Sequence, residues 1–207
     1  MAREPRPKAV EVTATFFRYS SYDVPLWVRP NTTDERWHVA GDGPTQYLSE
    51  TPDGAWAELI RNENLRSEAD LSLVAMPLWQ LQIEQSRVAD YRDFETAEQA
   101  GFKPESLIDD DQDACRLEGR RLKEAGFAGV LYPSAALPGE QNLALFGPRI
   151  LLPWGAPRLL ASGIPGMRLT VGAPPKDLLP RVRHAGARHA GFSEYQRLKR
   201  RRTGKRP

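Results

Sequence analysis

Three charged side chains stand where a charge is costly, and their types fit the binding of an anionic substrate. Arg18 follows a run of apolar and β-branched residues, and Arg36 lies in a long loop beside a tryptophan. Glu58 falls beside the apolar face of a predicted helix, where a carboxylate needs partners. Each residue alone fits a strand-end charge or an ion-pair partner. Together they would form a cleft in which arginine forks hold an anion and a carboxylate acts on it.

The residues before Glu58 predict that a rigid helix carries its carboxylate. Thr51 can cap the helix through its hydroxyl, Pro52 suits the first helical position, and Asp53 complements the positive end of the helix dipole. Residues 46–49 predict a short strand directly before this helix. A carboxylate on a helix is held more firmly than one on a loop, as a catalytic role requires.

Other polar and aromatic residues could line the same cleft. Tyr19 and Tyr47 would offer flat ring faces to a cyclic group of a ligand. Ser134 follows a short buried strand over residues 128–133, at a place where strands commonly open into a site. Taken alone, Ser134 also fits the start of a turn, which serine hydroxyls favour.

The sequence lacks the residues and motifs of several common kinds of site. Its 207 residues contain one cysteine, Cys115, and three histidines, so we expect neither a thiolate cluster nor a histidine metal centre. It has no phosphate-binding glycine loop, dinucleotide signature or nucleophile elbow, and Ser134 has no evident histidine partner. Catalysis is therefore expected from Arg, Glu, Ser, Tyr and Asn side chains, without a metal.

The order of hydrophobic and turn-forming segments predicts a mixed α+β domain. A strand is expected over residues 10–19, followed by a long loop rich in proline and glycine. Pro77 indicates an edge or a bulge in the next extended segment. The acidic cluster from Asp109 should cap a helix that ends at Gly126 and buries Cys115. Further strands or extended segments are expected over residues 71–83, 88–94, 128–134, 142–146 and 149–152.

Net charge divides the chain into an acidic body and a basic C-terminal part. From Arg158 onward there are 13 Lys or Arg and 2 acidic residues, a net charge of +11, whereas the preceding part carries −9. We expect a flexible N-terminus over residues 1–9, a folded domain over 10–157 and a partly flexible basic extension over 158–207. The extension could bind nucleic acid, an acidic partner or the body, or remain a solvated tail.

The hydropathy of the chain predicts a cytoplasmic protein. No apolar run reaches the length of a membrane span. The first residues also lack the apolar stretch of a signal peptide. No contact with a membrane is therefore expected.

Five short motifs resemble, in order and spacing, those of the RES domain, a family named for its conserved Arg, Glu and Ser. RES proteins form the toxin half of RES-Xre toxin-antitoxin pairs. The resemblance covers roughly residues 10–152. Its motifs are Phe17-Arg18-Tyr19, Arg36-Trp37, Gln46-Tyr47-Leu48-Ser49 with Ala57-Glu58, Gly129-Val130-Leu131-Tyr132-Pro133-Ser134, and Asn142-Leu143-Ala144-Leu145-Phe146.

The resemblance implies a fold similar to ADP-ribosyltransferases of the diphtheria-toxin type, with a split β-core, flanking helices and NAD as substrate. Glu35 stands where the family usually has glycine, and an inward-pointing carboxylate there would weaken phosphate binding at Arg36. The implied roles are Arg18 and Arg36 as phosphate clamp, Tyr19 and Tyr47 as stacking groups, Glu58 as catalytic carboxylate, Ser134 as cleft-lining hydroxyl, and Asn142 as its support. Arg18 and Ser134 count with Glu58 among the implied catalytic groups.

The implied activity is that of a toxin that degrades NAD by cleaving the bond between nicotinamide and ribose. Water or phosphate could accept the ADP-ribose, and NAD would be a substrate with no permanently bound cofactor. The implied partners are an Xre-like antitoxin and further copies of either protein, with DNA reached only through the antitoxin. One alternative is mono-ADP-ribosylation of a protein target. Another is a nucleic-acid-binding module that acts through the basic residues 197–206.

Overall fold

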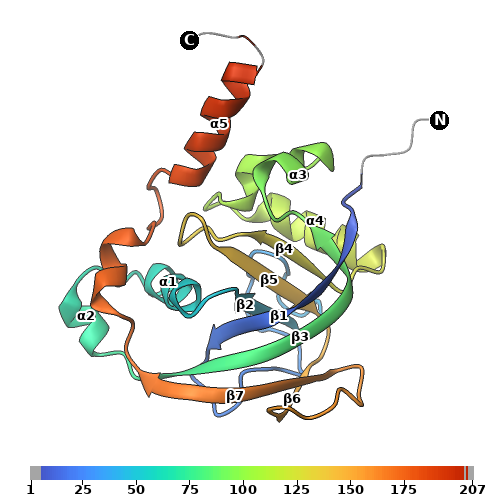
Figure 1. Ribbon diagram of the computed structural model, residues 1–207, viewed down its shortest axis with the longest axis vertical. Coiled ribbons are helices and arrows are strands. Elements are labelled where there is room, and N and C mark those ends of the chain that lie inside the picture. The colour runs from blue at the N-terminus through green and yellow to red at the C-terminus, as the bar shows by residue number, and fades with distance from the viewer. Residues whose placement is uncertain (1–5, 203, 205–207) are drawn as a thin grey trace.

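The structure is a computed structural model that describes residues 6–202 and 204 (Figure 1). Residues 1–5 of the expected flexible N-terminus lie outside the described residues, as do residues 203 and 205–207 of the basic extension. The strands are β1 (Ala9–Tyr19), β2 (Thr45–Ser49), β3 (Met76–Asp90), β4 (Gly129–Pro133), β5 (Gln141–Phe146), β6 (Ile150–Pro153) and β7 (Gly163–Gly172). The helices are α1 (Pro52–Asn62), α2 (Glu68–Ser72), α3 (Phe94–Gln99), α4 (Asp113–Glu124) and α5 (Ala190–Arg202), with short 3₁₀ helices η1 (Pro104–Leu107) and η2 (Lys176–Arg181).

The strands form a barrel with a two-strand extension. Their order is β1-β2-β5-β4-β3-β7-β6, and an additional pairing of β1 with β3 closes the first five strands into a ring. β7 and β6 continue the sheet beyond β3 and lie together at the bottom of Figure 1. The predicted mixed α+β fold is confirmed, and its core is a closed barrel.

Neighbouring strands of the barrel are paired over unequal lengths, and the site lies at a weak corner where the pairing is short. β1 pairs with β3 along its whole length, but with β2 only through Phe17 opposite Ser49. Beyond that pair, Arg18 and Tyr19 remain bonded to β3 alone. The corner between β1 and β2 is therefore open where Arg18 and Tyr19 lie, and α1 begins there directly after β2.

The start of α1 follows the sequence prediction. The Thr51 side chain accepts a hydrogen bond from the Gly54 N–H at 3.0 Å, Pro52 opens the helix, and Asp53 lies in its first turn. One face of α1, with Trp56, Leu59 and Ile60 among its residues, is buried in an apolar cluster with Leu78, Ala136, Leu178 and Val182. This packing fixes the helix that carries Glu58.

Two local predictions need correction. The segments 71–83 and 88–94 were expected separately, but β3 runs unbroken from Met76 to Asp90. Pro77 lies beside a register shift between Leu78 and Trp79 in the β3–β7 pairing, so the expected bulge is present. The helix expected from Asp109 begins instead after Gln112, which makes no side-chain cap, although Cys115 is buried as predicted.

The C-terminal extension contains a strand that the sequence did not predict. A partly flexible extension is predicted beyond residue 157, but β7 pairs antiparallel with β3. The glycine and proline residues of this strand argued against a strand in the sequence. Close packing explains why one of these positions is a glycine. A Cβ on Gly166 would lie 2.5 Å from Leu81 and 2.8 Å from Leu151 side-chain atoms. The expected division at residue 157 stays a prediction.

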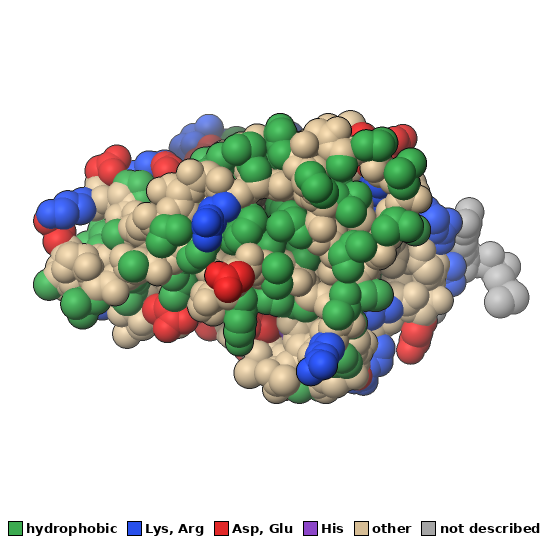
Figure 2. Space-filling model, turned by 90° about the horizontal axis from the view of Figure 1, so that it is seen from below, with side chains coloured by type: hydrophobic (Ala, Val, Ile, Leu, Met, Phe, Trp, Pro, Cys, Tyr) green, Lys and Arg blue, Asp and Glu red, His purple; other side chains and the backbone are tan. Residues whose placement is uncertain are grey.

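The outer face of β7 is apolar. Figure 2 looks onto this part of the molecule and shows hydrophobic side chains gathered across it. Met167, Leu169 and Val171 alternate along β7 and are 40%, 42% and 55% exposed. A contiguous exposed apolar surface is typical of an interaction surface.

Candidate active site

A cavity of about 230 Å³ lies at the open corner of the barrel. The end of β1, the loop from Ser20 to Arg36, β2 and α1 contribute most of its wall. Of the residues singled out from the sequence, those that line it are Arg18, Tyr19, Arg36, Tyr47, Glu58 and Asn142. The structure thus brings six of the seven candidate residues together.

Glu58 is half-buried, and two donors hold one of its carboxylate oxygens. Its Oε1 accepts hydrogen bonds from Asn142 Nδ2 at 2.6 Å and from Ser134 Oγ at 2.8 Å. Ser49 and Asn142 are opposite each other on β2 and β5, and the Ser49 hydroxyl donates to Asn142 Oδ1 at 2.8 Å. None of the described residues donates to Oε2. Short bonds to a charged acceptor are strong, so the carboxylate is fixed in place with one oxygen uncommitted.

Ser134 does not line the cavity, which corrects its expected role as a cleft-lining hydroxyl. Ser134 is fully buried, with 0% exposure, and lies behind Glu58. While Ser134 Oγ donates to Glu58, it accepts from the N–H groups of Ala136 and Leu137 at 3.2 and 3.0 Å. The serine therefore starts a turn and supports the carboxylate at the same time.

Arg18 carries the least satisfied cation of the site. Its guanidinium carbon lies 4.4 Å from the ring centroid of Trp27, in a cation–π contact that the sequence analysis missed. Arg18 Nη1 is buried and has no hydrogen-bond partner among the described residues. Burial lowers the pKa of this guanidinium to about 10, against the opposing influence of Tyr19 and Glu35. A buried cation with an unused donor is suited to an anionic ligand.

Arg36 is more fully engaged than Arg18. Its Nη1 and Nη2 donate to the carbonyl oxygens of Ser106 and Asp109 at 3.4 and 3.1 Å. The neighbouring Trp37 is completely buried and packs against Tyr91 and Tyr132. These contacts hold Arg36 in the cavity wall, so part of its guanidinium fork is committed to the protein.

The two tyrosines differ in how the protein holds them. Tyr47 Oη accepts from the Trp37 N–H at 2.9 Å and lies 2.9 Å from His38 Nδ1. Tyr19 Oη accepts from Asn62 Nδ2 at 3.3 Å. Burial raises the pKa of both phenols, that of Tyr19 to about 12, so both remain protonated at neutral pH.

Glu35 and Arg61 also line the cavity. The inward position considered for Glu35 is the one it occupies, and its carboxylate has no hydrogen bond or ion pair to any described residue. Burial raises the pKa of this carboxyl, Arg18 opposes the shift, and Glu58 adds to it. Arg61, which the sequence analysis missed, pairs with Asp110. The cavity thus combines three arginines with two carboxylates.

Within residues 6–202 and 204, no group of three or more His, Cys, Asp or Glu side chains is placed to hold a metal ion. In the same part of the chain, no helix combines the length and the apolar composition needed to cross a membrane.

Comparison with known proteins gives three likenesses. A family model described as the RES domain matches residues 11–153. A probable NAD(+) phosphorylase of Mycobacterium tuberculosis is 32% identical over 117 residues, which are 54% of this chain and 52% of that protein. The chain therefore matches about half the length of that curated relative.

The third likeness is to a solved structure. In the crystal structure of the M. tuberculosis MbcT-MbcA toxin-antitoxin complex, one chain aligns with a TM-score of 0.61 and 19% identity. The alignment covers 78% of this chain and 87% of that chain. At this level of identity the likeness concerns the fold.

Proposed function

This chain belongs to the RES domain family, and on that premise we propose that it is a toxin that degrades NAD by cleaving the nicotinamide-ribose bond. The observation that carries the proposal is the pairing of Glu58, fixed by two donors, with a cavity that also contains the partnerless Nη1 of Arg18. The name of the mycobacterial relative, a probable NAD(+) phosphorylase, supports the choice of substrate.

Glu58 is the catalytic carboxylate in this proposal. As the bond between C1 of the ribose and the pyridinium nitrogen breaks, its electron pair passes to nicotinamide, which leaves as a neutral molecule. Positive charge develops on the ribose, and an anionic carboxylate stabilises that charge more in the transition state than in the ground state. No general acid is needed, because departure itself neutralises the pyridinium ring.

The arginines and tyrosines orient the dinucleotide. Arg18 binds the diphosphate through its unused donor, and Arg36 adds positive charge from the cavity wall. Tyr19 and Tyr47 flank the nicotinamide end. Ser134 and Asn142 act on the reaction by holding Glu58 Oε1.

The acceptor of the ADP-ribose is water or phosphate in this proposal. Transfer to a protein side chain is the alternative, and it would make the enzyme a mono-ADP-ribosyltransferase. We also propose that the barrel is of the ADP-ribosyltransferase type, with NAD at the weak corner between β1 and β2. A nucleic-acid function of the extension has less support, since Lys199 and Arg202 of α5 form ion pairs with Glu98 and Glu95 of α3.

An Xre-like antitoxin is the proposed partner, and the cavity rim offers it a surface. Tyr22, Val24 and Val28 lie in the loop after β1 and are 65%, 49% and 57% exposed, and Tyr22 lines the cavity. An antitoxin segment bound to the exposed apolar residues of this loop and covering Tyr22 would block entry of NAD. The apolar outer face of β7 offers a separate surface for oligomer formation. We place the reaction in the cytoplasm, with DNA reached only through the antitoxin.

Product analysis tests the proposal. Purified protein is incubated with NAD in the presence and absence of phosphate, and the products are separated and identified. Nicotinamide is expected with ADP-ribose if water is the acceptor, or with phosphorylated ADP-ribose if phosphate is. Label retained on protein would instead support the transferase. NAD that stays intact under both conditions would contradict the proposal.

A further inference from the structure

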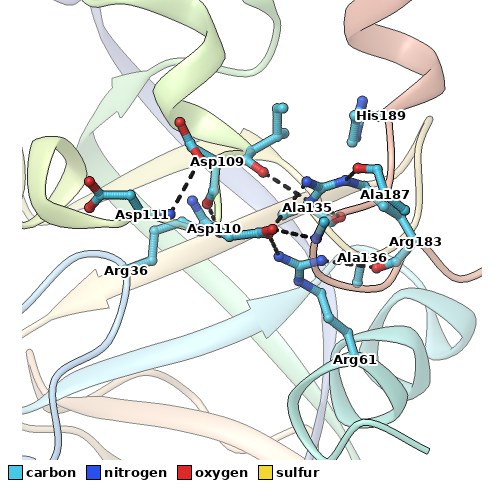
Figure 3. A network of polar contacts seen from close by, with 12 residues as sticks. Arg36, Arg61, Asp109, Asp110, Asp111, Ala135, Ala136, Arg183, Ala187 and His189 are labelled. Atoms are coloured by element: carbon cyan, nitrogen blue, oxygen red, sulfur yellow. Dashed lines mark hydrogen bonds and ion pairs between the residues drawn. The ribbon is translucent and has the colours of Figure 1, made fainter. Parts of the chain in front are cut away.

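A segment outside the matched RES span lies against the back of the Ser134–Glu58 pair. This C-terminal strap, residues 182–189, connects η2 to α5 (Figure 3). It donates hydrogen bonds to three successive carbonyl oxygens of the turn that starts at Ser134. His189 Nε2 donates to Ser134 O at 3.0 Å, Arg183 Nη1 to Ala135 O at 3.3 Å, and the Arg183 N–H to Ala136 O at 2.7 Å. The strap therefore fixes the backbone of the turn.

The strap also holds the helix that carries Glu58. Arg61 lies one helical turn after Glu58, and its Nη1 donates to the Arg183 carbonyl oxygen at 3.0 Å. The Asp110 carboxylate joins the two arginines, since it pairs with Arg61 and with Arg183 Nη2 and accepts the Gly186 N–H at 2.6 Å. Figure 3 shows Asp110 between these two guanidinium groups. One segment thus connects both partners of the Ser134–Glu58 hydrogen bond.

His189 is held in a single tautomer. Its Nδ1 accepts the Phe192 N–H at 3.0 Å at the start of α5, so the proton resides on Nε2 and points at Ser134 O. The residue is buried, with 4% exposure, and packs edge-on against Phe94. Burial lowers the pKa of this imidazole, which keeps it neutral at neutral pH. The donor to Ser134 is therefore a fixed part of the fold.

We infer that Arg183 and His189 are positioning residues for Glu58, acting through the turn at Ser134. The inference rests on the proposed cleavage of NAD, since it assigns them a part in that reaction. Without the strap, the turn loses donors on three carbonyl oxygens, and the Ser134 hydroxyl is no longer held 2.8 Å from Glu58. Catalytic groups must be held to within about half an ångström, and supporting contacts set that precision.

Kinetics of matched variants test the inference. Arg183→Ala should lower kcat for NAD cleavage by roughly 10- to 100-fold, because a displacement of about 1 Å has that effect. KM should change little, since Arg18 and Arg36 remain. The control is Arg181→Ala, two residues earlier, whose guanidinium makes an exposed ion pair with Asp53. His189→Ala should resemble Arg183→Ala, whereas the control should match the wild type.

A double-mutant cycle separates positioning from general stability. If Arg183 acts through Ser134, then adding Arg183→Ala to Ser134→Ala should lower kcat little further. Two full, multiplying losses would overturn the inference. Should Arg183→Ala fail to fold, Asp110→Asn removes the charge that joins the arginines and should lower kcat to a smaller extent. Wild-type kcat in a folded Asp110→Asn variant would also count against the strap.

Hydrogen exchange gives a readout that does not depend on the substrate. The amides of Ala136 and Leu137 are bonded to Ser134 Oγ. They should exchange faster in Arg183→Ala or Asp110→Asn than in the wild type, while β4 and β5 stay protected. Unchanged exchange of this turn would overturn the inference even if NAD proves not to be the substrate. Faster exchange in a protein without NAD cleavage would contradict the proposed function alone.

Discussion

The two sides of Glu58 differ in how completely their polar groups are satisfied. Behind it, Ser134 and Asn142 bond to the carboxylate, and the strap bonds to three carbonyl oxygens of the turn. On the cavity side, Arg18 Nη1 and the Glu35 carboxylate have no hydrogen-bond partner among the described residues. Folded proteins pair nearly all buried polar groups, so the unpaired Arg18 Nη1, on a residue that lines the cavity, is suited to an anionic ligand. The side with paired polar groups fixes the position of Glu58, and the side with unpaired polar groups is where we propose that the substrate binds.

The largest effect is expected from Glu58→Gln, which keeps the shape of the side chain and removes its charge. The amide oxygen can still accept from Ser134 and Asn142, so the fold should be retained. NAD cleavage should fall by roughly 100- to 1,000-fold, since one preorganised electrostatic group is commonly worth that much. The rate is measured by nicotinamide release, with thermal melting as the check on folding. A folded variant with near wild-type turnover would remove Glu58 from the mechanism.

Ser134→Ala tests the satisfied side. It leaves the Ala136 and Leu137 amides without their acceptor and should cost about 1–3 kcal/mol of the free energy of unfolding. The same change should lower kcat by roughly 10- to 100-fold with little effect on KM, because Glu58 loses one of its two donors. Denaturant unfolding and steady-state kinetics measure the two effects. Ser72→Ala, at an exposed position of α2, is the control and should change neither quantity.

Arg18→Met tests the unsatisfied side and should act in the opposite sense on stability. Removing a buried cation with an unused donor should leave the free energy of unfolding unchanged or raise it by about 1 kcal/mol. KM for NAD should rise roughly tenfold or more, since a lost hydrogen bond to a charged group costs about 1.5–3 kcal/mol. Exposed Arg168 on β7 supplies the control, Arg168→Met. A destabilised Arg18→Met variant with normal KM would reverse the contrast between the two sides.

The smallest effect is expected at Glu35, and it depends on pH. Its carboxylate lies in the same cavity as the arginines, so Glu35→Gln should lower KM for NAD by a few-fold through reduced repulsion of the phosphates. Burial raises the pKa of Glu35, with Glu58 adding to the effect and Arg18 opposing it, so protonation begins at higher pH than for an ordinary carboxyl. KM of the wild type should therefore fall as the pH is lowered from neutrality. A pH profile that Glu35→Gln leaves unaltered would assign that titration to another group.

Local signals made much of the cavity predictable from the sequence. The cap and proline at the start of α1 predicted the helix of Glu58, and the apolar and β-branched run of β1 placed Arg18 and Tyr19 at a strand end. Five motifs gave the RES family, which the family model confirms. The cap and the strand depend on residues close together in the chain, where hydrophobic period and capping chemistry act directly, whereas the family rests on the resemblance of the motifs.

The supporting side could not be predicted, because its contacts join distant parts of the chain. His189 and Ser134 are 55 positions apart, and Arg183 and Ala135 are 48 apart. In a basic, proline-rich segment, the sequence does not distinguish Arg183 from the solvent-exposed arginines near it. The position of Arg183 depends on β7, which pairs with β3 and brings the extension back to the barrel. The glycines of β7 kept this strand from being predicted. The contact of Arg18 with Trp27 was also not predicted, because Trp27 lies in an irregular loop.

The most direct test of the account is a crystal structure of the Glu58→Gln variant with intact NAD. The account predicts that a diphosphate oxygen accepts a hydrogen bond from Arg18 Nη1, the donor with no partner in the described part of the chain. It also predicts the nicotinamide-side ribose beside the side chain at position 58. A nucleotide bound elsewhere, with Arg18 Nη1 still unpaired, would contradict the claim that this corner of the barrel is the active site.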